Sequence, residues 1–381
     1  MSLPDRVAAA LRSLPAPVCA YVYDRAVARR RAAEVRAALP AGTVLLYAVK
    51  ANGHPEMVRA LAQACDGLEV ASGGELRLAV EAGARRLVFG GPAKTDAELT
   101  LAVRAGAQIN VESAHELRRL DALAAAEGVV ADVCLRINRA AAGPSGSHAM
   151  TGTPTAFGID ETQLGEVLAL PAPHVRVIGF HLHAVSNNLD GAAHARFLTD
   201  CLDWSVRTAR EHGLRLRVVN AGGGLGVDYR SAARMDVAAL RDVRVPGGVT
   251  LIVEPGRFLA ADAGWYAATV LDVKRTHGRW FAVLRGGTHH FRLPAAWGYS
   301  HPFTVLDVPQ WPYPWQRPQV RDAEVDVAGE LCTPRDVLAR GERVGLLRAG
   351  DVVVFGRAGA YGWDISHHEF LRHPPPEFVI L

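Results

Sequence analysis

The chain has 381 residues, of which 49% are hydrophobic and 21% are charged, and its formal net charge is +3. This balance is typical of a globular protein with a sizeable core and excludes a largely disordered chain. Lysine and arginine do not cluster with aromatic residues, and no apolar run is long enough to cross a bilayer, so neither a nucleic-acid-binding protein nor a membrane protein is expected.

The cysteines and the first residues argue against further classes of protein. The five cysteines are widely spaced, odd in number and contain no Cys-x-x-Cys pair, so we expect no disulfide framework and no bound metal. The first residues lack a charged segment followed by a long apolar run, which predicts a cytoplasmic protein. The arginines of residues 25–31 are expected to form the solvated face of a helix.

Residues 43–257 alternate between short β-rich runs and helical runs rich in Ala, Leu, Glu and Arg. Eight units of this length predict a TIM barrel, here assigned to residues 25–265, whereas an open doubly wound sheet would need fewer strands. The eight strands are predicted at residues 43–49, 67–71, 86–90, 107–111, 132–137, 175–183, 216–220 and 250–254.

The sequence pattern changes after about residue 265, where predicted short strands alternate with turns rich in Gly, Pro and Trp. This pattern predicts an all-β second domain of residues 266–381, to which residues 1–24 would also belong. Segment 18–23 is predicted as an extra strand of that domain. The other strands are predicted at residues 268–273, 280–284, 324–327 and 351–355.

Chemically useful side chains follow the predicted barrel strands, whose C-terminal ends meet at the face where TIM barrels form active sites. Lys50 follows the first strand, and partial desolvation there would make its amine a nucleophile or a Schiff-base former. A surface lysine at a strand end is the alternative. His183 and Ser186 follow the sixth strand, where an imidazole can stack on a flat ring and a hydroxyl can bind phosphate. A satisfied polar pair at a strand end is the alternative there.

The last two predicted strands end in a glycine run and in a carboxylate. Glycines 222–224 let backbone N–H groups approach a phosphate, at a place where TIM barrels often bind one, and a flexible turn is the alternative. Glu254 can pair with a protonated ring nitrogen, and Arg257 can pair with a phosphate or a carboxylate. A Glu–Arg ion pair without a ligand is the alternative.

The predicted β domain offers three further candidates. Cys332 is a lone thiol, and such residues are usually small buried hydrophobes. Tyr361 is flanked by glycines and could offer its hydroxyl to a phosphate, or it is simply a turn residue. Asp336 lies in the same segment as Cys332.

Together these segments resemble the fold-type III decarboxylases that use pyridoxal 5'-phosphate (PLP), which include the diaminopimelate, ornithine and arginine decarboxylases. The resemblance implies PLP as the cofactor and a barrel of the alanine racemase type. It spans nearly the whole chain, and its ordered set of motifs is highly specific. The matching stretches are residues 47–52, 69–76, 135–138, 157–159, 181–186, 220–226, 254–258, 332–336 and 358–362.

The resemblance implies a role for each candidate residue. Lys50 would hold the cofactor as a Schiff base, His183 would stack on its ring, and Glu254 would keep the ring nitrogen protonated. Cys332 would protonate the carbanion left by loss of the α-carboxylate. The phosphate would be held by Ser186, Gly223, Gly224, Gly256, Arg257 and Tyr361. Cys332, Asp336 and Tyr361 would reach the active site of the partner subunit, which implies an obligate homodimer.

Departures from the family pattern bear on the substrate. Val185 replaces the usual glycine of the phosphate segment, so this loop is expected to differ. Residues 333–335 read Thr-Pro-Arg where the diaminopimelate enzymes have Glu-Ser-Gly, and an arginine suits a more anionic substrate. Segments 289–294, 297–301 and 362–371 resemble the siderophore-biosynthesis branch, which decarboxylates an amino acid already joined to citrate. The residues predicted to bind this substrate are Arg292, His301, Arg335 and Asp336.

Other functions remain open on the sequence alone. The nearest is a diaminopimelate or basic amino-acid (ornithine, lysine or arginine) decarboxylase, and residues 333–335 argue against it. An alanine racemase usually pairs the ring nitrogen with arginine, so Glu254 favours a decarboxylase. A catalytically inactive PLP-binding regulatory homologue tends to lose the lysine or the cysteine, and this chain retains both Lys50 and Cys332.

Overall fold

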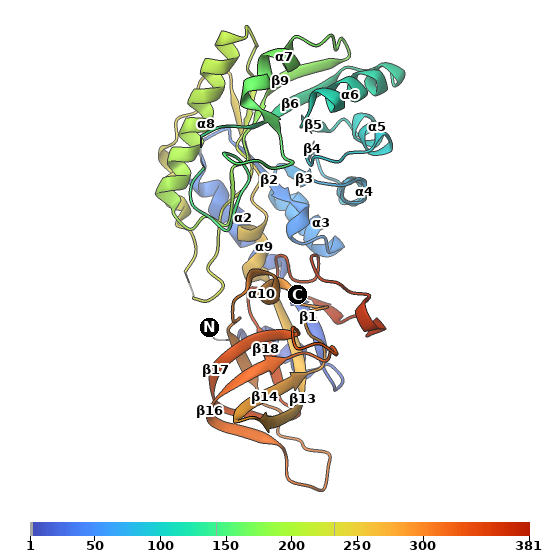
Figure 1. Ribbon diagram of the computed structural model, residues 1–381, viewed down its shortest axis with the longest axis vertical. Helices are drawn as coiled ribbons and strands as arrows, with labels where there is room; N and C mark the ends of the chain where they lie inside the picture. The colour runs from blue at the N-terminus through green and yellow to red at the C-terminus, as the bar shows by residue number, and fades with distance from the viewer. Residues whose placement is uncertain (1–2, 142, 232) are drawn as a thin grey trace. The chain divides into compact units, whose positions relative to one another are not determined.

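The computed structural model describes residues 3–141, 143–231 and 233–381 and divides the chain into two compact units (Figure 1). The barrel unit comprises residues 29–227 and 233–259, and the β unit comprises residues 3–28, 228–231 and 260–381. Within the described residues, no helix is both long and apolar enough to cross a membrane.

The barrel unit is built on eight parallel strands that close on themselves, because each strand pairs with the next and the last pairs with the first. The predicted TIM barrel is therefore confirmed, as are all eight predicted strands. Its buried core includes Val44, Leu46, Val88, Cys134 and Ile252. In order around the barrel the strands are β2 (Val44–Ala48), β3 (Gly67–Val70), β4 (Leu87–Phe89), β5 (Gln108–Val111), β6 (Ala131–Asn138), β9 (Val175–His181), β11 (Val218–Asn220) and β12 (Thr250–Val253).

Helices lie outside these strands (Figure 1), and several begin at a side chain that caps them just after a strand ends. Ser72, Ser113 and Asp190 each accept a hydrogen bond from an N–H of the first helical turn, and Thr95 forms a full capping box with Glu98. These caps keep the strand-to-helix loops short. The helices are α2 (Arg25–Ala38), α3 (Pro55–Ala64), α4 (Gly73–Glu81), α5 (Asp96–Arg104), α6 (Ala114–Ala126), α7 (Leu164–Leu168), α8 (Gly191–Glu211) and α9 (Arg257–Ala260).

The arginine-rich segment lies on α2, as predicted. Arg29 and Arg30 are exposed, and Arg31 pairs with Glu34 one turn further along. Arg29 and Arg30 therefore lie on a solvated helix face, whereas the Arg31 side chain is only 17% exposed.

The β unit is an eight-stranded sheet built from both ends of the chain. β1 (Cys19–Tyr23) pairs antiparallel with β13 (Gly264–Thr276) and parallel with β19 (Glu377–Ile380), which confirms the predicted N-terminal strand. Val7 and Leu11 of α1 (Asp5–Arg12) pack into its core. The remaining elements are β14 (Arg279–Leu284), α10 (Leu293–Trp297), β15 (Phe303–Leu306), β16 (Gln319–Ala328), β17 (Val337–Arg348) and β18 (Val352–Phe355).

Candidate active site

Lys50 lies on a single 3-10 turn directly after β2, and its amine is accessible, with 43% of the side chain exposed. Its Nζ contacts the carboxylate of Glu69 on β3. The chain has two other lysines. Lys94 is buried in an ion pair with Glu116 at 2.6 Å, and Lys274 lies in the β unit, 3.7 Å from Asp272. Lys50 is thus the lysine that combines a barrel-strand end with a reachable amine.

Glu254 follows β12 and is held as an anion. Nδ2 of Asn220 donates a hydrogen bond to its Oε1 at 2.6 Å, and Nε2 of His181 lies 3.6 Å from its Oε2. Burial acts to raise the pKa of Glu254, but His181, the charge of Lys50 and the Asn220 hydrogen bond outweigh burial and lower the pKa below its ordinary value. A buried carboxylate kept ionised in this way is suited to pair with a protonated ring nitrogen.

His183 is a neutral, flat ring beside this carboxylate. Burial lowers its pKa well below the ordinary value, and the charges of Arg136, His181 and Lys50 lower it further. The backbone N–H of Gly223 donates to its Nδ1 at 3.2 Å, and the His181 ring lies nearly parallel to it. A neutral imidazole held in this way can stack on a planar cofactor.

The glycine run packs closely against neighbouring segments. A Cβ on Gly222 would lie 2.5 Å from Nδ1 of His183, and one on Gly223 would lie 2.6 Å from the carbonyl oxygen of Glu254. Gly222 and Gly224 also have φ of +69° and +105°, a region that glycine adopts most readily. These positions therefore require glycine, which argues against a merely flexible turn.

An unsatisfied amide marks the same end of the barrel. Both side-chain polar atoms of Asn110 on β5 are buried and have no hydrogen-bond partner within the described residues. A Cβ on Gly90 would lie 3.4 Å from Glu69 Oε1 and 3.8 Å from Asn110 Nδ2, which places the amide near Glu69. Buried polar groups are normally paired, so this orphaned amide, the glycine cradle and the accessible amine of Lys50 fit a bound polar cofactor such as PLP.

Several further polar residues, to which the sequence assigned no role, form a network at the ends of the barrel strands. Glu112 accepts hydrogen bonds from Arg136 at 2.8 Å, from the Gly91 amide at 2.9 Å and from the Gly158 amide at 3.0 Å. Arg136 also lies over the ring of Phe157, 4.5 Å from its centroid. Their positions in the sequence could have indicated a role, since all of them lie on or just after barrel strands: Glu69, Glu112, Arg136 and Asn220.

The strand predicted at residues 175–183 is shorter than expected, and Ser186, predicted to follow it, lies on a separate short strand. β9 ends at His181, and a two-residue strand, β10 (Val185–Ser186), pairs with β7 (His148–Ala149). The backbone N–H of Ser147 donates to the Ser186 carbonyl at 2.7 Å. The strand pairing and this hydrogen bond fix the backbone at the predicted phosphate segment. The Val185 side chain is buried there.

The β unit holds the other predicted residues in different settings. The Cys332 thiol is exposed, whereas the other four cysteines are buried. His301 is buried, its Nδ1 lies 2.8 Å from the Tyr299 hydroxyl, and its Nε2 lies 2.8 Å from the Gly356 carbonyl. Asp336 is also buried and is bonded to backbone amides. Tyr361 occupies the left-handed region, with φ of +55°.

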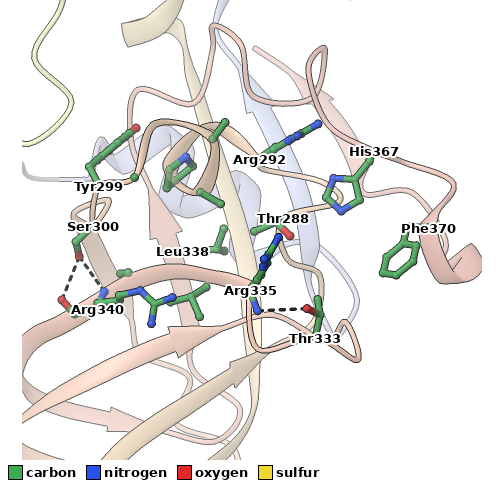
Figure 2. Close-up of a pocket in the computed structure, with 16 residues that line it drawn as sticks. Thr288, Arg292, Tyr299, Ser300, Thr333, Arg335, Leu338, Arg340, His367 and Phe370 are labelled. Carbon is green, nitrogen blue, oxygen red and sulfur yellow. Dashed lines mark hydrogen bonds between the residues drawn. The ribbon is translucent and has the colours of Figure 1, made fainter. Parts of the chain in front are cut away.

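Arg292 and Arg335 instead line a cavity of about 670 Å³ (Figure 2). Arg340 also lines it, and none of the three guanidinium groups is paired with a carboxylate within the described residues. The lining has hydroxyl groups and a histidine, His367, but no acidic side chain. Burial lowers the pKa of His367, and the charge of Arg292 lowers it further. The cavity is therefore a cationic pocket suited to a multiply charged anion.

Burial of His301 makes stability depend on pH. Burial lowers its pKa to about 4, against the opposing effect of its contact with Gly356. Because an unfolded histidine titrates near about 6.5, the unfolded chain binds this proton first, so stability is lost as the pH falls from about 6.5 towards about 4. At about pH 5 the loss from His301 is about 2 kcal/mol.

We expect His301→Gln to remove this part of the pH dependence in urea unfolding followed by tryptophan fluorescence. Exposed His115 offers the control, because His115→Gln should leave the pH dependence unchanged. Equal slopes of unfolding free energy against pH in the wild type and His301→Gln would contradict the assignment.

Comparisons with known proteins agree with this geometry. The family described as "Pyridoxal-dependent decarboxylase, pyridoxal binding domain" matches residues 25–261. The chain is 40% identical to 2-[(L-alanin-3-ylcarbamoyl)methyl]-2-hydroxybutanedioate decarboxylase of Staphylococcus aureus, over 97% of this chain and 96% of the relative. It is 32% identical to L-glutamyl-[BtrI acyl-carrier protein] decarboxylase of Niallia circulans, over 93% of this chain and 87% of the relative.

A solved structure shares the fold. Diaminopimelate decarboxylase of Helicobacter pylori, complexed with L-lysine, superposes with a TM-score of 0.84 over 98% of this chain and 93% of that chain, at 24% identity. The predicted family and cofactor are confirmed by the family match and the sequence relatives. The chain therefore belongs to the pyridoxal-dependent decarboxylases and is a PLP-dependent carboxy-lyase.

Proposed function

We propose that this enzyme decarboxylates an amino acid that is already joined to citrate, a reaction of siderophore biosynthesis. The observation that carries the proposal is the cavity lined by Arg292, Arg335 and Arg340 without an acidic side chain. The name of the Staphylococcus aureus relative describes such a compound, a hydroxy-dicarboxylate linked by an amide to the side chain of an amino acid. Guanidinium groups bind carboxylates through paired, charge-assisted hydrogen bonds.

In the barrel unit we assign the cofactor site to the residues gathered around Lys50. Bound PLP supplies an electron sink for the electrons left when carbon dioxide departs. Lys50 would hold the cofactor through its amine, Glu254 would keep the ring nitrogen protonated, and His183 would offer its neutral face to the ring. The phosphate would be held by Ser186, Gly223, Gly224, Gly256, Arg257 and Tyr361.

In the β unit we assign proton donation to Cys332, because its thiol is exposed. By the family resemblance, Cys332 and Tyr361 would serve the barrel of a partner subunit, so we propose a homodimer with shared sites. Of the four residues predicted to bind substrate, we retain Arg292 and Arg335, which line the cavity. His301 does not line the cavity, but its Nδ1 contacts the hydroxyl of Tyr299, which does. We therefore assign His301 a supporting role behind Tyr299. The cytoplasmic location and the domain limit at residue 265 stay predictions.

The test is carbon dioxide release from a panel of substrates: citryl-diaminopropionate, meso-diaminopimelate, ornithine, lysine and arginine. We expect release from the citrate conjugate. Arg292→Gln and Arg335→Gln should each raise KM for it by about 10- to 100-fold with kcat little changed, because each removes a charge-assisted contact made in both ground and transition states.

Arg321→Gln is the matched control, since Arg321 is exposed on β16 and does not line the cavity. Release from diaminopimelate or a basic amino acid, with none from the conjugate, would favour the alternative decarboxylase. An unchanged KM in Arg335→Gln would remove the cavity from the substrate site.

A further inference from the structure

The exposed thiol of Cys332 lies on a tight loop between β16 and β17 that closes on itself. The Gly329 N–H donates to the Asp336 carbonyl at 2.9 Å, and the Thr333 N–H donates to the Leu331 carbonyl at 2.7 Å. The loop thus has a defined backbone, and whatever fixes its ends also sets where the thiol lies.

Asp336 fixes this loop from inside. Its side chain is buried, its Oδ1 accepts from the Thr288 N–H at 2.6 Å, and its Oδ2 accepts from the Leu331 N–H at 2.8 Å. A carboxylate that bridges two backbone amides joins the Cys332 loop to the segment after β14. Charge-assisted hydrogen bonds of this kind are among the stronger ones in proteins.

Two glycines make room for the carboxylate. A Cβ on Gly329 would lie 2.2 Å from Asp336 Oδ2, and a Cβ on Gly287 would lie 2.5 Å from the same atom. Neither position therefore tolerates a side chain without displacing Asp336. The carboxylate is enclosed by backbone on both sides and does not line the cationic cavity.

A second carboxylate anchors the loop nearby. Glu330 pairs with Arg285, and its Oε1 lies 3.5 Å from both His289 Nε2 and His373 Nδ1. Its backbone N–H donates to the Gly286 carbonyl at 2.8 Å. The start of the loop is therefore tied to the same segment that Asp336 holds at its end.

We propose that Asp336 is a positioning residue that sets the place of the Cys332 thiol and of the Thr333–Arg335 wall of the cavity, rather than a residue that contacts substrate. The inference rests on the proposed function for the role of Cys332 in proton donation. Asp336→Asn keeps the shape of the side chain but replaces one acceptor by an N–H donor facing a backbone N–H, so the loop should shift.

The test is the alkylation rate of Cys332 by iodoacetamide in the PLP-loaded wild type and in Asp336→Asn, read by peptide mass spectrometry. Because the other cysteines are buried, the rate reports this thiol. We expect the alkylation rate to change roughly tenfold, as expected for one mismatched buried hydrogen bond. We also expect a fall in kcat and, because Thr333 and Arg335 move with the loop, a rise in KM. Gly329→Ala, which displaces the same carboxylate without altering charge, should change alkylation similarly. Asp322→Asn, at an exposed position within β16, should not.

Unchanged alkylation of Cys332 with a raised KM would overturn the proposal in favour of substrate contact. Hydrogen exchange in the wild type provides a test that needs no variant: slow exchange of the Leu331 amide supports the proposal, and exchange as fast as in an unfolded chain contradicts it. The alkylation and hydrogen-exchange measurements need no substrate, so these two results stand apart from the citrate assignment.

Discussion

Lys50→Ala is expected to abolish the visible absorbance of lysine-bound pyridoxal and to lower carbon dioxide release by a factor on the order of 10⁴. The reason is that the amine of Lys50 is accessible at the end of β2, whereas Lys94 is buried in an ion pair and Lys274 lies in the β unit. No other lysine in the chain can take over. Absorbance spectra and carbon dioxide release check both parts.

Two controls separate the chemistry of Lys50 from its charge. Lys50→Arg keeps a cation beside Glu69 but cannot bond to the cofactor aldehyde, so it should be as inactive as the alanine variant. Lys274→Ala should keep full activity and absorbance. Retention of the absorbance in Lys50→Ala would show that another group binds the cofactor.

Glu254→Gln is expected to lower kcat by a factor on the order of 10²–10³, a typical cost of removing one preorganised electrostatic group. The amide cannot stabilise a proton on the ring nitrogen, although it can still accept the hydrogen bond from Asn220. The PLP content should stay close to that of the wild type, because Lys50 and the phosphate segment are untouched. Turnover and cofactor content, measured on the same preparation, check the two halves of this expectation.

The matched control is Glu81→Gln at the exposed end of α4, which should leave kcat unchanged. Wild-type turnover in Glu254→Gln would mean that the ring is not held by this carboxylate. Loss of the cofactor with loss of turnover would instead assign Glu254 a structural role.

The barrel and the location of its site were predictable because two regularities reinforce each other. Strand and helix alternate in the sequence with little interruption, and parallel strands bring their C-terminal ends to one face. Lys50, His183, the glycine run and Glu254 could therefore be assigned to one site from order alone. The polar residues that contact them, such as Asn220 and Glu69, lie in the same segments. Which groups they contact does not follow from the sequence and is seen only in the fold.

The strands and the cavity of the β unit were harder to predict from the sequence, for physical reasons. β17 contains Gly341 and Gly345 among charged residues, which hides its alternation, and β15 and β19 are only four residues long. The cavity gathers Arg292, Arg335, Arg340 and His367 from separate segments, and no periodicity links them. Burial of Asp336 could not be inferred either, because it depends on glycines at positions 287 and 329.

The central pairing of β1 with β13 and β19 bears on how the protein is made. β1 is synthesised before the barrel, its antiparallel neighbour β13 follows only after the whole barrel, and its parallel neighbour comes from residues 377–380. Non-local pairings of this kind form slowly and leave strand edges exposed during synthesis. The barrel segment can therefore complete its pairing first, while β1 waits for β13 on one side and for residues 377–380 on the other.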